Sequence, residues 1–251
     1  MAIAVHVLKA RLSVFLVVSL LAAAFTVLSM LHQEARAGER RGFSSAELID
    51  GFHKSVFGLE FGSYRYGQIV KKFTGPVRLR VVNQATVDRT GAIAGFLGRL
   101  RGAVPGLDIR LVHDDSSANF TVYVVNRSAY MATVRNSVLG THSGSAPGQC
   151  LVRVEPGAKG IRRSTAVIVS DEGEGLFRRC MVEEILQGLG PMNDSASLKY
   201  SVFNDSSTYD QFMPFDRMVV SMLYDRRVRH GMSPGEVDRV LPVVLAGMGA
   251  R

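Results

Sequence analysis

The spacing of apolar residues along the chain predicts a mixed α/β domain. Apolar and basic residues alternate over residues 77–82, the pattern of a half-buried strand. Apolar residues recur at every third or fourth position over residues 87–100, which is typical of one face of a helix. The same criteria predict further strands over residues 107–112, 120–125, 150–155 and 165–169, and further helices over residues 46–57, 128–134 and 215–223.

Polar residues mark where two of the helices begin. Ser44 or Ser45 is a suitable N-cap for the first helix, and Glu47 supplies an acidic first turn. Ser233 and Glu236 have the spacing of a capping box, with a proline at the first helical position. A last short helix is therefore expected near the end of the chain.

The central feature of the sequence is the run from Cys180 to Ser195. It begins as a helix whose apolar residues fall in one narrow arc and therefore face a core, namely Val182, Ile185, Leu186 and Leu189. Gly190 followed by Pro191 predicts the end of this helix, with the glycine as a left-handed cap. Two adjacent carboxylates consequently lie on the last turns of a helix that leaves a core.

The spacing E-E-x-x-Q-x-x-G-x-x-N in this run resembles the metzincin zinc motif H-E-x-x-H-x-x-G-x-x-H. Glu183, Gln187 and Asn193 stand where the three histidines would be, and Glu184 takes the position of the general base. The resemblance implies a zincin-like fold for residues 38–251, with a mixed sheet, a long helix, an active-site-type helix and a C-terminal helical subdomain. It also implies that residues 150–155 form an edge strand along which an extended peptide would lie.

The same run resembles, more closely, the signature C-x-x-E-E-x-x-Q-x-L-G-x-x-N-D-S of a proteobacterial family of exported proteins known as domain of unknown function 2927. This second match adds Asp194 to the motif residues. It continues downstream at three short segments, Phe215-Asp216-Arg217, Leu223-Tyr224-Asp225 and Gly231-Met232-Ser233. The family pattern has a threonine cap where this chain has Met213, so the start of the helix over residues 215–223 lacks its side-chain cap. The family name carries no activity, and the chemistry has to be argued from the residues.

The beginning of the chain has the layout of a secretory signal. Basic residues within positions 1–11 precede a continuous apolar run over residues 12–31, and Ala35-Arg36-Ala37 offers an A-x-A cleavage site. We expect residues 1–37 to be a signal peptide and the protein to be periplasmic or secreted. The run is also long enough to span a bilayer. The alternative is therefore that residues 12–31 are retained as an inner-membrane anchor.

The chain has a formal net charge of +8, and removing residues 1–37, with three basic residues and one acidic residue, would leave +6. Eight of the 30 basic residues come in four separate pairs that are expected on a solvated surface: Lys71 and Lys72, Arg99 and Arg101, Arg162 and Arg163, Arg178 and Arg179. An exported chain without an aromatic-interleaved basic stripe is not expected to bind nucleic acid. Weak attraction to anionic envelope surfaces is compatible with the charge.

Cys150 and Cys180 are the only cysteines. An even number of cysteines in an oxidising compartment predicts a disulfide. The alternative is two free thiols or a redox pair, and the spacing is far from the C-x-x-C that redox pairs use.

The motif residues are poor zinc ligands. Glu183, Gln187 and Asn193 offer oxygen atoms, two of them from uncharged amides, whereas zinc sites of this kind use neutral imidazoles. We therefore expect no metal and no other cofactor. Without a metal, water next to Glu184 keeps nearly its bulk pKa, and the usual route to a nucleophile is missing.

Three functions remain open for the domain. In the first, the domain binds a peptide or another envelope component. In the second, it is a metal-independent, peptidase-like hydrolase with Glu184 as general base. In the third, the motif is structural, and Glu183 and Gln187 hold the loop at residues 193–195. Adjacent helical residues point about 100° apart, so Glu183 and Glu184 are poorly placed to act on one substrate atom. We favour binding or structure over catalysis.

Overall fold

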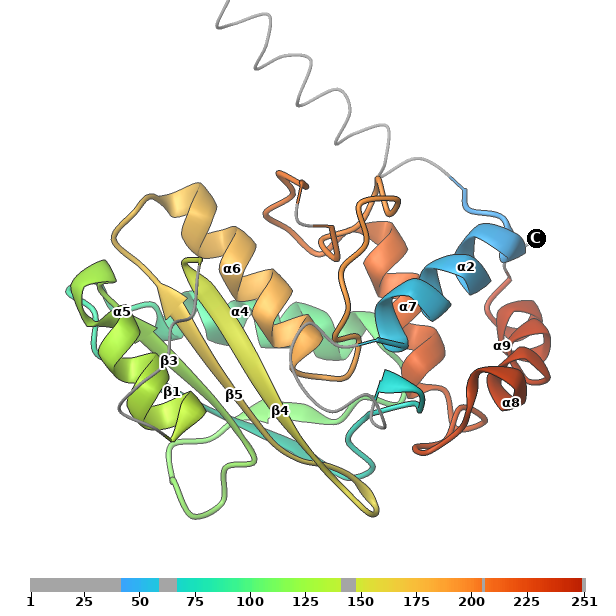
Figure 1. The fold of residues 1–251 in the computed structure, drawn as a ribbon, viewed down its shortest axis with the longest axis horizontal. Coiled ribbons are helices and arrows are strands. Elements are labelled where there is room, and N and C mark those ends of the chain that lie inside the picture. Colours follow the sequence, from blue (N-terminus) through green and yellow to red (C-terminus); the bar gives the residue numbers. More distant parts are fainter. Residues whose placement is uncertain (1–41, 59–66, 141–147, 205, 250–251) are drawn as a thin grey trace, which may run out of the picture. The chain divides into compact units, whose positions relative to one another are not determined.

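A five-stranded mixed sheet forms the centre of the computed structural model, which describes residues 42–58, 67–140, 148–204 and 206–249 (Figure 1). The strands are β1 (Val77–Asn83), β2 (Ile109–Leu111), β3 (Phe120–Val125), β4 (Cys150–Gly157) and β5 (Gly160–Val169). They lie in the order β2-β1-β3-β5-β4, and only β4 runs antiparallel to its neighbour. The predicted α/β class is confirmed, and β4 is an edge strand, as expected for residues 150–155.

Helices cover both faces of the sheet (Figure 1). They are α2 (Ser45–Val56), α4 (Thr90–Ala103), α5 (Arg127–Thr133), the π-helical turn η1 (Val134–Leu139), α6 (Glu174–Gln187), α7 (Pro214–Tyr224), α8 (Pro234–Asp238) and α9 (Leu241–Gly247). Of these, α2, α7, α8 and α9 form a group beside the sheet (Figure 1). On β5, Ala166 and Ile168 join the large core under α4 and α6, whereas Val167 and Val169 join a smaller core with Tyr130 of α5. The alternation along one strand thus separates two hydrophobic layers.

The predicted caps are present at both of the helices where the sequence placed them. The Ser44 side chain accepts a hydrogen bond from the backbone N–H of Glu47, whose carboxylate accepts one from the Ser44 N–H in return. Ser233 and Glu236 form the same reciprocal box at the start of α8. These contacts fix the first turns of α2 and α8, and α2 packs on α7 and α9 although it lies far from them in sequence.

Two helix boundaries differ from the sequence prediction. α4 begins at Thr90 instead of residue 87, because the Asp88 carboxylate accepts the Thr90 N–H and holds the preceding residues in a turn. α6 ends at Gln187, and the next residues tighten into a turn in which the N–H of Gly190 bonds to the Gln187 carbonyl at 2.9 Å. Gly190 has a positive φ, but its value of 138° is far from that of a left-handed helical cap, and the residue lies beyond the cap position at Gly188.

The chain from Val70 to Phe73, here called the lysine segment, passes through the core, and its four residues are all less than a tenth exposed. Its backbone bonds to distant parts of the fold. The Val70 N–H donates to the Met232 carbonyl at 2.8 Å, and the Lys72 carbonyl accepts from the Ile161 N–H at 2.9 Å. The lysine segment therefore links β5 with the chain that precedes α8.

Lys71 projects toward the carboxyl end of α2. Its ammonium donates to the carbonyl of Val56 at 2.8 Å and, at the longer distance of 3.5 Å, to that of Gly58. The last carbonyls of a helix have no partner within the helix, and they carry the negative end of its dipole. Burial lowers the pKa of Lys71 to about 8, and the lysine satisfies a helix end that water does not reach.

Lys72 projects to the carboxyl end of α7 instead. Its ammonium donates to the carbonyls of Leu223 at 2.7 Å, Asp225 at 3.1 Å and Val228 at 2.6 Å. Burial lowers the pKa of Lys72 to about 8, while the negative charge of Asp225 opposes that shift. The prediction that Lys71 and Lys72 form a solvated surface pair is therefore wrong.

No helix in the described ranges is long and apolar enough to cross a membrane. The predicted signal peptide over residues 1–37 and the alternative anchor over residues 12–31 lie outside the described residues. Both therefore stay predictions.

We expect Lys72→Met to lower the free energy of unfolding strongly, because it leaves buried carbonyls at the end of α7 without their donor. Each buried acceptor left unsatisfied costs about 1–3 kcal/mol. Urea denaturation monitored by circular dichroism measures the loss. The matched control is Lys54→Met, which removes a lysine whose exposed ion pair with Asp50 is worth about 1 kcal/mol or less. Equal losses in the two variants would contradict the role assigned to Lys72.

Candidate functional site

The second half of α6 is enclosed by the sheet and by neighbouring helices. All residues from Cys180 to Gln187 are buried, which includes the two glutamates as well as the predicted apolar face. A side chain at Gly188 would place its Cβ 2.2 Å from the ring of Phe120, so only glycine allows the helix end to approach β3 this closely. Ser164 of β5 donates its hydroxyl to the Gly188 carbonyl at 2.6 Å and fixes that approach.

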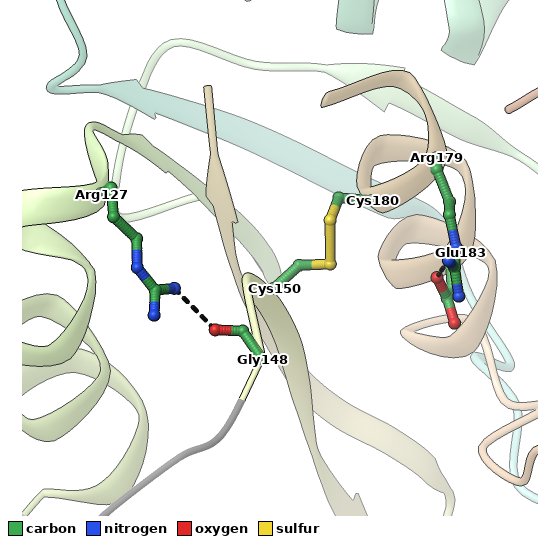
Figure 2. Close-up of a disulfide and its surroundings, with 6 residues drawn as sticks. All are labelled: Arg127, Gly148, Cys150, Arg179, Cys180 and Glu183. Carbon is green, nitrogen blue, oxygen red and sulfur yellow. Dashed lines mark hydrogen bonds and ion pairs between the residues drawn. A yellow bond between two sulfur atoms is a disulfide. The ribbon is translucent and has the colours of Figure 1, made fainter. Parts of the chain in front are cut away.

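A disulfide joins Cys150, the first residue of β4, to Cys180 of α6 (Figure 2). The predicted pairing is confirmed. The bond closes a loop with a sequence separation of 30, and in the chain-entropy model a loop of this size stabilises a fold by roughly 3 to 4 kcal/mol. Arg127 of α5 donates to the Gly148 carbonyl at 2.6 Å, so the start of β4 is also tied to the opposite face of the sheet.

Glu183 lies on α6, away from the disulfide, and its carboxylate is 3.5 Å from the guanidinium of Arg179 one turn earlier (Figure 2). The glutamate is 7% exposed. A buried carboxylate requires compensation by charge or hydrogen bonds, and Arg179 supplies part of it. The charge of Glu183 also raises the pKa of Asp216 on α7.

Asp216 is the centre of a buried polar network that the sequence analysis did not identify. Its carboxylate accepts the hydroxyl of Ser201 at 2.6 Å and the backbone N–H of Val202 at 3.1 Å, and it reaches back to the backbone of Met213. Burial raises the pKa of Asp216 to about 7, against the opposing effect of these hydrogen bonds. The aspartate thus performs half of a capping box at the start of α7, where Met213 provides no side-chain cap.

Gln187 and Asp194 meet at the end of α6, where the Gln187 amide donates to the Asp194 carboxylate at 3.0 Å. Asn193 is directed elsewhere. Its side-chain amide donates to the Lys54 carbonyl at 2.7 Å, and its backbone N–H donates to the Ser55 carbonyl at 3.1 Å. Asn193 therefore acts with Lys71 in satisfying the carboxyl end of α2.

Each motif residue contacts a different part of the protein. Glu183 contacts Arg179, Gln187 contacts Asp194, and Asn193 contacts the end of α2. Within the part of the chain that the structure describes, no group of three or more His, Cys, Asp or Glu residues lies in a position to hold a metal ion.

Glu184, the candidate general base, is 5% exposed. Its negative charge adds to the effect of burial in raising the pKa of Tyr130 to about 12. A general base has to lie within hydrogen-bond reach of the proton that it removes. For Glu184 to act on a substrate, water or substrate would have to enter the space that the described residues enclose.

The outer edge of β4 offers backbone hydrogen-bonding groups. Gln149 stands opposite Val169 and accepts its N–H at 3.0 Å, so this pair is hydrogen-bonded. Because bonded and non-bonded pairs alternate along an antiparallel ladder, the backbone groups of Cys150, Val152 and Val154 point away from β5. No other strand of the described residues pairs with β4. This open edge starts at the disulfide that fixes it to α6.

Sequence reasoning missed Asp216 and the two buried lysines. Asp216 was within reach, because it lies in one of the three segments that match the family signature. The lysines had a weaker signal, which is that Val70 and Phe73 flank them on both sides. Nothing local indicated that their partners are the ends of two helices, one of them about 150 residues later.

We expect the stability of the parent protein, relative to an Asp216→Asn variant, to fall as the pH rises from about 4 to about 7. The pKa of Asp216 is raised in the folded state from 3.8 to about 7. Its contribution is therefore fully present below the unfolded pKa and is lost as the pH rises through the folded one. Urea denaturation of both proteins at several pH values gives the difference. A difference that stays constant, or that rises with pH, would show that Asp216 is ionised throughout.

A family described as protein of unknown function (DUF2927) matches residues 45–243, which include all of the strands and α6. The match covers the motif, the lysine segment and Asp216, so the features described above lie within the shared region. A comparison with curated proteins finds no match. Since the family's sequence model spans most of the chain, the protein belongs to the DUF2927 family.

Proposed function

We propose that this protein is an exported envelope protein whose domain is a non-catalytic binding module, and that it holds an extended peptide or a similar envelope component against the open edge of β4. The observation that carries the proposal is the edge itself. The backbone N–H and C=O groups of Cys150, Val152 and Val154 point away from β5. The disulfide and Arg127 hold the start of the strand in place. A fixed edge strand can pair with an added strand at little entropic cost.

The contacts of the motif support a binding scaffold over a catalytic centre. Gln187 holds the turn that follows α6 through Asp194, and Asn193 ties that turn to the end of α2. In the metzincin comparison these positions would be metal ligands, and here we propose that the zinc-free motif braces the α6 end behind β4. A hydrolase with Glu184 as base would instead need an accessible carboxylate, and this one is 5% exposed.

Export is supported by two independent observations. The sequence has an apolar run with an A-x-A site behind it, and the two cysteines of the chain form a disulfide, the state that oxidising compartments favour. Placement in the periplasm, with or without a retained anchor, is part of the proposal.

We expect N-terminal sequencing of the protein isolated from the cell envelope to return Gly38, because cleavage would follow Ala37. Recovery of Met1 or Ala2 would favour residues 12–31 as a retained anchor. Recovery of the full chain from the cytoplasm alone would overturn export.

The binding proposal is tested with peptides selected from a random phage-displayed library against the full chain. We expect an enriched peptide to lose at least tenfold in affinity for Val152→Pro, because proline removes an N–H that points to the added strand and breaks no bond to β5. Val152→Ala also replaces the valine side chain but keeps the N–H, and it should bind the peptide like the parent. Isothermal titration calorimetry gives the affinities, and thermal unfolding checks that both variants fold.

Two results would contradict the proposal. One is a library without peptides enriched over an empty support, and the other is an enriched peptide that binds the proline and alanine variants equally. If the parent cleaves the selected peptide and Glu184→Gln does not, the protein is a hydrolase and the binding-module proposal is wrong.

A further inference from the structure

A groove of about 600 Å³ lies where α4, α6 and the start of α7 meet the chain at residues 210–212. Its lining is Arg99, Ala103, Arg178, Met181, Val182, Asp210, Gln211, Phe212, Pro214 and Arg217. Met181 and Val182 are buried in its floor, and the three arginines are exposed around it. The groove therefore combines an apolar floor with a cationic rim, and its volume is within the range of small-ligand sites.

The three arginines are in different electrostatic situations. Arg178 is committed to Asp210, with the guanidinium and carboxylate 2.6 Å apart. Arg99 and Arg217 have no carboxylate partner among the described residues. Two guanidinium groups on one groove thus remain available for an anionic ligand.

Aromatic contacts support the position of Arg99. Its guanidinium lies 5.9 Å from the centroid of the Phe96 ring, and Phe96 packs edge-to-face against Phe212, at a ring distance of 6.2 Å. Phe96 is completely buried. An arginine beside a fixed ring, and a groove wall built on that ring, lose less freedom when a ligand binds.

We propose that this groove binds a peptide segment in which an acidic side chain stands next to an apolar one. The forked guanidinium groups of Arg99 and Arg217 suit carboxylates, to which arginine donates two parallel hydrogen bonds. The apolar neighbour would lie on Met181 and Phe212. Asp210 and Gln211 offer acceptors to peptide N–H groups, which a phosphate ion lacks.

The charges also argue against a segment of this same chain as the occupant. Residues 1–41 carry five basic and two acidic residues, so that segment has the same sign as the rim of the groove. The groove shares no residue with the edge of β4. The inference consequently stands apart from the binding function proposed for that edge.

The test uses the full chain and a synthetic hexapeptide, Gly-Glu-Leu-Glu-Phe-Gly, with blocked ends. Its matched control is Gly-Gln-Leu-Gln-Phe-Gly, which has the same shape without the charges. We expect calorimetry to show binding of the acidic peptide and at least tenfold weaker binding of the amide peptide. The combined substitution Arg99→Gln and Arg217→Gln should lower the affinity for the acidic peptide by about tenfold or more, because charge-assisted hydrogen bonds are lost.

Arg226→Gln is the control variant, because Arg226 is an exposed arginine of a different groove and its loss changes the net charge in the same direction. It should bind the acidic peptide within twofold of the parent, as should Val152→Pro. The proposal is overturned if the double variant binds as tightly as the parent, or if the amide peptide binds equally well. It is also overturned if inorganic phosphate or phosphatidylglycerol vesicles bind at Arg99 and Arg217 and the acidic peptide does not.

Discussion

The two buried ammonium groups on consecutive residues are the constraint on which the rest of this fold depends. Lys71 and Lys72 reach the carboxyl ends of α2 and α7, respectively, from one short piece of chain. Neither helix end can move away without leaving a charge in a dry environment. A buried cation is costly unless it is fully hydrogen-bonded, and here the cost enforces one relative position for two helices.

The same segment limits what surrounds it. A side chain at Gly190 would place its Cβ 2.1 Å from the Lys71 carbonyl oxygen, so the turn after α6 runs directly over the lysine segment. Tyr224, the last residue of α7, donates its hydroxyl to the Leu189 carbonyl at 2.9 Å. The end of α6 is therefore positioned by the lysine segment and α7 from one side and by the disulfide to β4 from the other. Through the disulfide, this double attachment also holds the first residue of β4.

Local patterns were enough to predict the sheet and most of the helices. Phe120 to Val125 form a strand with the expected bounds, because a short, apolar, β-branched run between polar turns has few alternatives. The disulfide and the edge position of β4 were also predicted. The end of α6 was not, because the approach of Gly188 to Phe120 and the hydroxyl of Ser164 are tertiary contacts that the sequence around Gly190 does not reveal.

The candidate site was less predictable than the fold. Spacing identified the residues at the end of α6, but it did not show that Asn193 would turn to α2, or that Asp216 would lie close enough to Glu183 to feel its charge. A lysine pair normally indicates a solvated surface, and only the partners of Lys71 and Lys72 show otherwise. Such partners are selected by the three-dimensional structure and leave little trace in neighbouring sequence. The π-helical turn η1 is a further feature without a clear local signal.

The distance in sequence between Lys72 and its partners has a consequence for the order of folding. The three carbonyl acceptors lie 151, 153 and 156 residues further along the chain. A chain that emerges from its amino end, whether from a ribosome or through a membrane, exposes Lys72 long before its acceptors exist. The lysine segment must then stay hydrated, and the core around it must stay open, until residue 228 has appeared. Closure of this core is therefore a late and long-range event, which slows folding and leaves apolar surface exposed for longer.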